Sequence, residues 1–279
     1  MGRHTHRVEN KLPRARTSCE TPAVTEHTNR VVRLFDELAP VYDEFLPFFA
    51  GFADLHVAWL DPDPGTRALD LGAGSGALTG ALLARGCQVT AVDAAPAMVA
   101  KLARLHPAAE TRTMDVARLD FPDQSFDLVT AGFVIHLLDD PAATAAEAHR
   151  VLRPGGVFSF STPHGVENAP EWDFHEALNA EFRQYIPEGG GRLSRQLDEE
   201  QLLTDAGFHD LDYIAVEQRL PVPDADTFWN WQLSHGSRAF IDSLPEPRRQ
   251  EFEARLRKQL ATMDPIVHAS GAAFDRATA

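Results

Sequence analysis

The chain has 279 residues, of which 44% are hydrophobic, so it can bury a large core and lies near the upper size limit of a single domain. Its formal net charge of −15 disfavours a nucleic-acid substrate, because a polyanion would be repelled. No apolar run approaches the roughly 18 residues that cross a bilayer, so we expect no membrane insertion. The two cysteines, Cys19 and Cys87, give neither a disulfide framework nor metal-ligand spacing, and we therefore expect a cytoplasmic protein.

The chain is predicted to begin with a tail and two helices. Residues 1–27 carry basic side chains but no apolar segment after them, so we expect a disordered tail and not a secretory signal. Apolar residues repeat at helical spacing over residues 28–39, with Thr28 or Asn29 as the N-cap. A second apolar stretch, residues 45–59, predicts another helix, which we expect to cover a ligand cleft.

From residue 66 onward, short apolar strands alternate with helices. We predict strands near 66–71, 88–92, 109–114, 126–131 and 156–162, and helices near 76–85, 96–105 and 141–152. Asp140-Pro141 is typical of a helix cap followed by proline, and residues 153–156 are typical of a helix stop with a tight turn. The alternation implies an α/β fold with a doubly wound, mostly parallel sheet, which binds ligands at the carboxyl ends of its strands.

A glycine-rich loop follows the first of these strands. Asp70 ends the strand, and Gly72, Gly74 and Gly76 follow at alternating positions. Glycines let a backbone turn and pass close beneath a flat nucleoside. The same residues also satisfy the dinucleotide-binding pattern, in which a helix N-terminus receives a pyrophosphate. The loop alone therefore leaves the cofactor open.

The companions of the loop narrow the choice. The second predicted strand ends in Asp93, where a carboxylate can accept both hydroxyls of a ribose. Asp115 follows the third strand, Phe126-Asp127 opens the fourth, and the turn at 152–156 leads into the fifth. In this order and spacing the chain resembles the class I S-adenosylmethionine-dependent methyltransferases, within the group of ubiquinone, menaquinone and natural-product methyltransferases. The resemblance covers roughly residues 28–162 well and the remainder loosely.

This resemblance implies a seven-stranded, Rossmann-like methyltransferase sheet with added N-terminal helices. It also implies S-adenosylmethionine as cofactor and S-adenosylhomocysteine as product. The glycines would lie beneath the methionine moiety and Asp93 on the ribose. Asp115, Val116 and Met98 would contact the adenine, and Tyr42 would close over the cofactor. With their neighbours on the same loop and strand ends, the predicted cofactor-binding residues are Tyr42, Asp70, Gly72, Ala73, Gly74, Gly76, Asp93, Ala94, Met98, Asp115, Val116, Ala131 and Gly132.

After residue 162 the pattern becomes irregular. Residues 163–197 are too long and too rich in proline and glycine for an ordinary connection, so we predict a lid inserted after the fifth strand. A helix that opens at residue 198 and closes near Gly207 precedes a sixth strand near 210–216. Extra helices over 224–263 and a last strand near 266–275, antiparallel in the family's pattern, complete the chain. Residues 28–279 are therefore expected to form one methyltransferase domain.

Aromatic residues gather in the two regions expected over the cleft. Of 24 in the chain, 7 lie in residues 31–60 and 10 in residues 165–240, which predicts an apolar or aromatic acceptor pocket. Phe228, Trp229 and Trp231 equally fit a structural role in anchoring the extra helices. The residues predicted to contact the acceptor are Phe133, His164, Trp172, Tyr185 and Trp229.

His136 is the predicted catalytic residue. It lies just beyond the fourth strand, where the resemblance implies residues that face the acceptor, and histidine suits proton removal from a hydroxyl near neutral pH. Orienting a helix is its alternative role. We expect no metal, because capping of the next helix explains Asp139-Asp140 and no third oxygen ligand follows at useful spacing.

Three functions follow from these observations. The first is S-adenosylmethionine-dependent methyl transfer to a small, apolar or aromatic natural-product acceptor, with O-methylation favoured over N- or C-methylation. The second is a quinone-type C-methyltransferase. The third is a methyltransferase-fold protein that catalyses a cyclisation or only binds a ligand. The expected partner is a small-molecule acceptor, and the sequence leaves the acceptor atom and the oligomeric state open.

Overall fold

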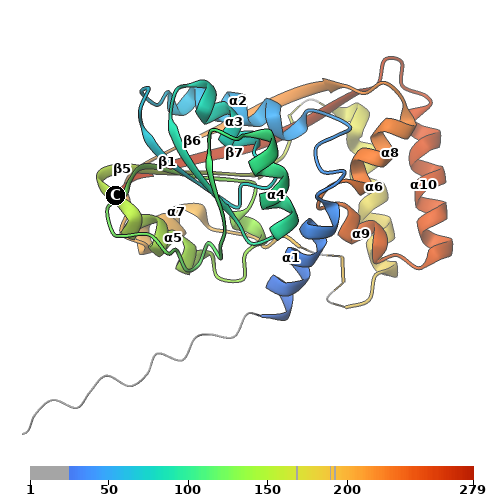
Figure 1. The fold of residues 1–279 in the computed structure, drawn as a ribbon. Helices are drawn as coiled ribbons and strands as arrows, with labels where there is room; N and C mark the ends of the chain where they lie inside the picture. Colours follow the sequence, from blue (N-terminus) through green and yellow to red (C-terminus); the bar gives the residue numbers. More distant parts are fainter. Residues whose placement is uncertain (1–24, 168, 189, 192) are drawn as a thin grey trace, which may run out of the picture.

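A seven-stranded sheet in the order β3-β2-β1-β4-β5-β7-β6 forms the centre of the molecule (Figure 1). The structure, a computed structural model, describes residues 25–167, 169–188, 190–191 and 193–279. β7 is antiparallel to both of its neighbours, and the pairs among β1 to β5 are parallel. The strands are β1 (Arg67–Leu71), β2 (Gln88–Asp93), β3 (Glu110–Thr113), β4 (Phe126–Gly132), β5 (Leu152–His164), β6 (His209–Pro221) and β7 (Val267–Thr278). The predicted fold class is confirmed.

Helices cover both faces of the sheet. α2 (Phe48–Leu60) and α3 (Ala77–Ala84) pack on one face, while α5 (Pro141–Val151) and α7 (Glu199–Asp205) pack on the other. Successive strand residues point to opposite faces, so Ala68 joins the α2–α3 cluster and Leu69 the α5–α7 cluster. α1 (Glu26–Leu38) packs on α4 (Pro96–Leu105), which follows β2.

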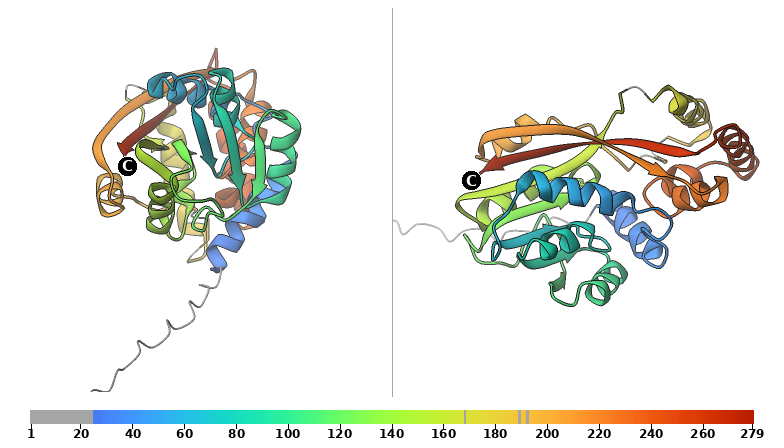
Figure 2. Two further views of the ribbon diagram at one scale, coloured as in Figure 1. Left: turned by 60° about the vertical axis from the view of Figure 1, so that its left-hand side comes forward. Right: turned by 90° about the horizontal axis from the view of Figure 1, so that it is seen from above.

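A second group of helices lies beyond one end of the sheet, where β6 and β7 extend past the other strands (Figures 1 and 2). It consists of α6 (Asp173–Phe182), α8 (Ala225–Leu233), α9 (Arg238–Asp242) and α10 (Glu246–Leu260). These helices share a core of their own, in which Phe182, Phe228 and Phe252 are fully buried. The molecule therefore has one core in the sheet and another in this helical group.

The N-terminal boundary differs from the prediction. α1 begins at Glu26, and the Thr25 hydroxyl caps it by accepting a hydrogen bond from the Thr28 amide at 3.1 Å. The predicted cap at Thr28 or Asn29 is wrong, because a hydroxyl one turn earlier is available to start the helix. Residues 25–27 thus belong to the domain and not to the tail. The rest of the predicted tail, residues 1–24 with Cys19, lies outside the described residues.

Several elements are longer than the local pattern indicates. β5 begins at Leu152, because Leu152 pairs with Phe126 before a register shift. β6 and β7 pair along their length out to Pro221 and Val267, well beyond the predicted sixth strand. The segment predicted as an irregular lid contains α6 and the short helices η2 (Pro170–Trp172) and η3 (Arg183–Tyr185). Among the described helices, none has the length and apolar character needed to cross a membrane.

Candidate functional site

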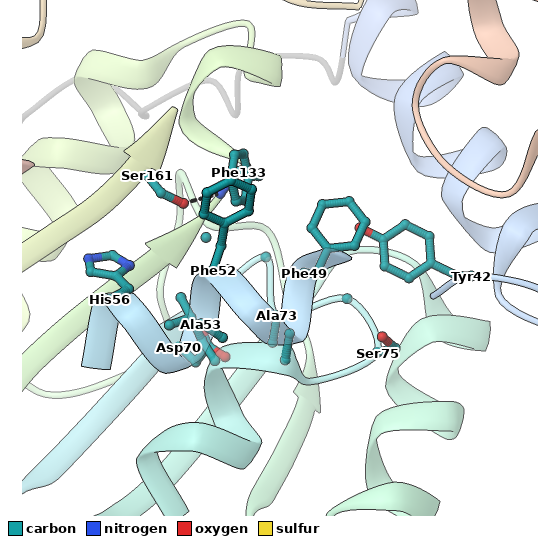
Figure 3. A pocket seen from close by; sticks show the side chains of 15 residues that line it. Tyr42, Phe49, Phe52, Ala53, His56, Asp70, Ala73, Ser75, Phe133 and Ser161 are labelled. Carbon is teal, nitrogen blue, oxygen red and sulfur yellow. Dashed lines mark hydrogen bonds between the residues drawn. The ribbon is translucent and has the colours of Figure 1, made fainter. Parts of the chain in front are cut away.

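Three neighbouring cavities lie around Tyr42 and Phe133, and two of them border the loop that follows β1. The loop cavity, about 110 Å³, lies between the glycine-rich loop and α1. The α2 cavity, about 40 Å³, lies between the same loop and α2 (Figure 3). The large cavity, about 670 Å³, is bounded by α6, α9 and the end of α8. Tyr42 and Phe133 line all three, so the cavities meet at these two rings.

The glycine-rich loop has the backbone that the sequence predicts. Gly72, Gly74 and Gly76 have φ angles of 60°, 55° and 100°, in the left-handed region that favours glycine. A Cβ on Gly72 would lie 2.5 Å from Cγ2 of Val134, so this position also lacks room for a side chain. At Gly74 the nearest atom would be Cε1 of Tyr42 at 3.6 Å. A Cβ on Gly74 would therefore fit without a clash, in van der Waals contact with the Tyr42 ring.

Asp93 fixes the loop from the end of β2. Its Oδ2 accepts a hydrogen bond from the Gly74 amide at 2.9 Å, and its Oδ1 accepts one from the Ala95 amide at 2.8 Å. Burial raises the pKa of Asp93, although these amide hydrogen bonds oppose the shift. Each oxygen retains a lone pair for a ligand in the loop cavity.

Asp70, which was predicted to bind the cofactor, also makes structural hydrogen bonds. Its carboxylate is fully buried and accepts hydrogen bonds from the hydroxyls of Thr79 at 2.7 Å and Thr130 at 3.2 Å. Burial raises the pKa of Asp70 to about 6. Asp70 thereby ties the loop to α3 and β4 while lining the α2 cavity. The sequence analysis missed the two threonines, since their partner is distant along the chain.

The loop and α2 cavities bring together ten of the predicted cofactor residues: Tyr42, Asp70, Gly72, Ala73, Gly74, Asp93, Ala94, Asp115, Val116 and Gly132. Three others line neither cavity. Met98 is fully buried against Leu38 and Ala39, because α1 covers this side of α4. Ala131 points into the α5–α7 core, and Gly76 lies on the far side of the loop beside α4.

Phe133 is held at the junction of the cavities. It has a φ of 53°, uncommon for a residue with a side chain, and its amide donates to Oγ of Ser161 at 3.0 Å (Figure 3). Phe52 meets its ring edge at 5.4 Å between centroids, and Phe49 stacks on Tyr42 at 5.1 Å. α2 thus supplies the aromatic cover that was predicted for this helix.

His136 lines the large cavity. Its side chain is nearly buried, with 7% exposed, and its Nδ1 has no hydrogen-bond partner among the described residues. Burial lowers the pKa of His136 to about 4, so the ring is neutral near pH 7. Its backbone carbonyl accepts a hydrogen bond from the Arg195 amide at 2.8 Å, which attaches the segment before α7 to the site.

The large cavity is lined without carboxylates. The chain carries 41 acidic residues, yet no Asp or Glu is among the described residues that line this cavity. Its charged lining residues within the described ranges are Arg183 and Arg195, and Arg195 pairs with Asp139 at 2.5 Å. The cavity therefore disfavours a cationic ligand.

Most of the residues predicted to contact an acceptor lie elsewhere. Phe133 lines the large cavity, but His164, Trp172, Tyr185 and Trp229 do not. Trp172 and Trp229 are buried in the core of the helical group, where Trp172 donates from Nε1 to the Val267 carbonyl at 2.7 Å. Tyr185 packs beneath Arg248, and His164 is exposed at the end of β5. The alternative role in anchoring the helices fits Trp229, and Trp172, which was predicted only as an acceptor contact, also packs in this core.

The comparisons with known proteins agree with this arrangement. Residues 69–160 match a family model described as a methyltransferase domain. Over 263 residues the chain is 30% identical to nocamycin O-methyltransferase from Saccharothrix syringae, and this match covers 85% of the chain and 91% of that protein. The chain belongs to the S-adenosylmethionine-dependent methyltransferases. This methyltransferase is also 33% identical over 168 residues to a ubiquinone biosynthesis O-methyltransferase from Idiomarina loihiensis, with 57% of the chain and 67% of the relative covered.

Solved structures share the fold of this methyltransferase. YcgJ protein from Bacillus subtilis superposes with a TM-score of 0.55 at 20% identity, covering 81% of this chain and 97% of that one. The [4+2]-cyclase SpnF superposes with a TM-score of 0.51 at 18% identity, covering 82% and 81%. At these identities the likeness concerns the fold alone.

Asp139 connects the walls of two cavities in this methyltransferase. Its carboxylate accepts hydrogen bonds from the Thr28 amide at 3.1 Å, from the Thr28 hydroxyl at 2.7 Å and from the Thr25 hydroxyl, and it pairs with Arg195. Although burial opposes it, the hydrogen bond from the Thr28 side chain contributes to lowering the pKa of Asp139, which stays ionised. α1 lines the loop cavity, and Arg195 lines the large cavity. The Asp139 carboxylate therefore connects one wall of each cavity.

We expect Asp139→Asn to weaken S-adenosylhomocysteine binding about tenfold, because the loss of charge-assisted hydrogen bonds releases α1 from the loop cavity. Isothermal titration calorimetry measures the effect. Asp140→Asn is the matched control: Asp140 only caps α5, by accepting a hydrogen bond from the Ala143 amide at 2.8 Å, and asparagine caps equally well. Equal affinities of the two variants would contradict the role given to Asp139.

Proposed function

We propose that this methyltransferase binds S-adenosylmethionine in the joined loop and α2 cavities and methylates a hydroxyl oxygen of an uncharged natural-product acceptor in the large cavity. The observation that carries the proposal is the position of His136. His136, whose buried Nδ1 has no partner among the described residues, lines the large cavity three residues after Phe133, whose ring lines all three cavities. A hydroxyl bound there would have a proton acceptor beside it.

The residues of the two smaller cavities fit the cofactor. Gly74 and Asp93 line the loop cavity, and the Asp93 carboxylate can accept the ribose hydroxyls there. Asp115 and Val116 line the other end of the loop cavity, beside the predicted adenine position. When bound, S-adenosylmethionine supplies a methyl group already activated by the positive sulfur. The protein then needs to align the acceptor oxygen and exclude water.

His136 handles the proton in this proposal. As the acceptor oxygen bonds to the methyl carbon, the carbon–sulfur bond breaks and the sulfur keeps the electron pair. The hydroxyl proton becomes strongly acidic and passes to the neutral ring of His136, so the positive charge moves from sulfur to imidazole. Burial lowers the pKa of His136 to about 4, so the ring is unprotonated at neutral pH and is a weaker base than an exposed histidine.

The lining of the large cavity supports oxygen over a basic nitrogen as the methylated atom. An ammonium group enters a low-dielectric cavity favourably only when an anion compensates its charge. The described lining provides arginines and neutral polar groups instead. The relative covered over 91% of its length is named an O-methyltransferase, which favours the same choice.

The test is S-adenosylhomocysteine formation with hydroxyl and amine acceptors of similar size, for example 2-naphthol and 2-(aminomethyl)naphthalene, an ammonium ion at neutral pH, together with larger polyphenols. We expect methyl gain, detected by mass spectrometry, on hydroxyl compounds only. Turnover of amines alone would overturn the choice of oxygen. Cofactor binding with no methyl gain on any acceptor would instead favour the cyclase or binding alternative.

A further inference from the structure

The wall of the large cavity that is formed by α6, α8 and α9 carries polar groups that methyl transfer does not use. Five of them lie on or just after these helices and line the cavity: His175, Asn179, Gln232, His235 and Ser237. We call them the α6–α8 polar wall. The Phe49 ring contacts both Phe133 and His235, with centroid distances of 5.8 Å and 6.3 Å. The wall is thus separated from the methyl-transfer position by about one aromatic layer.

Gln232 is the most informative member of this wall. Its side chain is buried, with 5% exposed, and lines the large cavity. Its amide makes no hydrogen bond to any described residue. The amide oxygen and nitrogen of Gln232 are not fully enclosed by protein, so they can pair with a ligand in the cavity.

His235 and Ser237 form a neutral pair with a defined proton arrangement. Nδ1 of His235 lies 2.6 Å from the Trp231 carbonyl, which can only accept, so Nδ1 carries the proton. Nε2 therefore accepts from the Ser237 hydroxyl at 3.1 Å. Burial lowers the pKa of both His235 and His175 to about 4, so the wall carries no charge from histidine at neutral pH.

We propose that the α6–α8 polar wall is a second binding subsite, which recognises hydroxyl or carbonyl oxygens on an uncharged, extended part of the acceptor remote from the methylated hydroxyl. The acceptor class is therefore a polyoxygenated, multi-ring or macrocyclic scaffold and not a single-ring phenol. Gln232 is its principal specificity-determining residue, because its amide both donates and accepts. The cavity volume of about 670 Å³ is sufficient for a ligand of this size.

This inference rests on the proposed function, because it takes the ligand of the wall to be the methyl acceptor. Its test measures binding and not methyl transfer. Protein saturated with S-adenosylhomocysteine is titrated with emodin, a polyoxygenated anthraquinone, and with anthrol, which has the same ring system and a single hydroxyl. Isothermal titration calorimetry gives the two affinities, and the intrinsic fluorescence, to which Trp231 beside His235 contributes with the three other tryptophans, gives a second readout. We expect emodin to bind more tightly than anthrol.

Gln232→Leu removes the amide and keeps a similar volume. We expect it to weaken emodin binding about tenfold, the effect of one lost hydrogen bond, and to change anthrol binding less than about twofold. Gln196→Leu is the matched control, because Gln196 lines the same cavity but is exposed. Asn179→Ala tests the wall independently should Gln232→Leu melt at a lower temperature than the wild type.

The outcomes separate the two proposals. Equal losses for emodin and anthrol, an effect of Gln196→Leu as large as that of Gln232→Leu, or no emodin binding at all would overturn the subsite. Selective loss of emodin binding without methyl transfer to any hydroxyl would support the subsite and remove the proposed function. Thermal melting and S-adenosylhomocysteine affinity, both expected unchanged, show that each variant remains folded.

Discussion

Replacing Gly74 with leucine is expected to abolish cofactor binding in an otherwise folded protein. The new side chain would extend from the loop toward Tyr42, into the space that the loop and α2 cavities share. The Cβ itself would lie in ordinary van der Waals contact, 3.6 Å from Cε1 of Tyr42, and the leucine methyl groups would press on this ring or enter the cavities. We expect the affinity for S-adenosylhomocysteine, measured by calorimetry, to fall more than about 100-fold, because the ligand and the leucine would occupy the same space.

The matched control for this variant is Gly155→Leu. Gly155 has a φ of 79°, comparable to the 55° of Gly74, and a Cβ there would meet nothing within 4 Å. Both variants carry the strain of a left-handed residue, about 1–2 kcal/mol, and should melt at similarly lowered temperatures. Only Gly74→Leu should lose the ligand. Retention of full affinity by Gly74→Leu would show that the cofactor does not lie over the loop.

Replacing His136 with alanine is expected to lower kcat about 100-fold, because the acceptor hydroxyl would lose the group that takes its proton. The Michaelis constant for S-adenosylmethionine should stay within about twofold, since His136 lines neither the loop cavity nor the α2 cavity. His136→Gln fills the same space and retains a hydrogen-bonding group, but it cannot act as a base. It should therefore be nearly as slow as His136→Ala.

The pH dependence of kcat provides a second readout. Because burial lowers the pKa of His136 to about 4, the wild-type rate should be flat from about pH 8 to pH 6 and fall as the ring is protonated near pH 4. An acid limb centred near 6.5 would instead report an exposed histidine. His209→Ala is the control, since His209 is exposed at the start of β6. Unchanged turnover in His136→Ala with saturating acceptor would remove the residue from the mechanism.

The site around the glycine-rich loop could be predicted because its determinants are local. A strand end, a run of alternating glycines and an acid at the end of the next strand all lie between Asp70 and Asp93. Parallel pairing of β1 with β2 then brings these groups together without further information. Met98 shows the limit of this reasoning, because its burial depends on α1, which packs on it from a distant part of the chain.

The acceptor side could not be predicted in the same way. Trp172 and Trp229 lie in the expected segments, but helix phase and packing turn them into the helical core and leave Gln232 facing the cavity. Composition does not distinguish an aromatic ring in a cavity wall from one in a core. Asp139 likewise gives no local signal, because its partners, Thr28 and Arg195, come from segments that meet only in the folded protein.

The paired ends of β6 and β7 have a consequence for how such an enzyme can diversify. Pro221 pairs with Val267, and the Val222 amide donates to the Ile266 carbonyl at 2.9 Å, so everything between them leaves and re-enters the sheet through adjacent residues. Residues 222–266, which include Gln232 and His235, therefore form an insertion on a hairpin stem. A graft from another member would close across one strand pair and would also have to repack against α6, which shares the helical core. Selectivity for new molecules can thus be recombined without rebuilding the nucleoside-facing half of the enzyme.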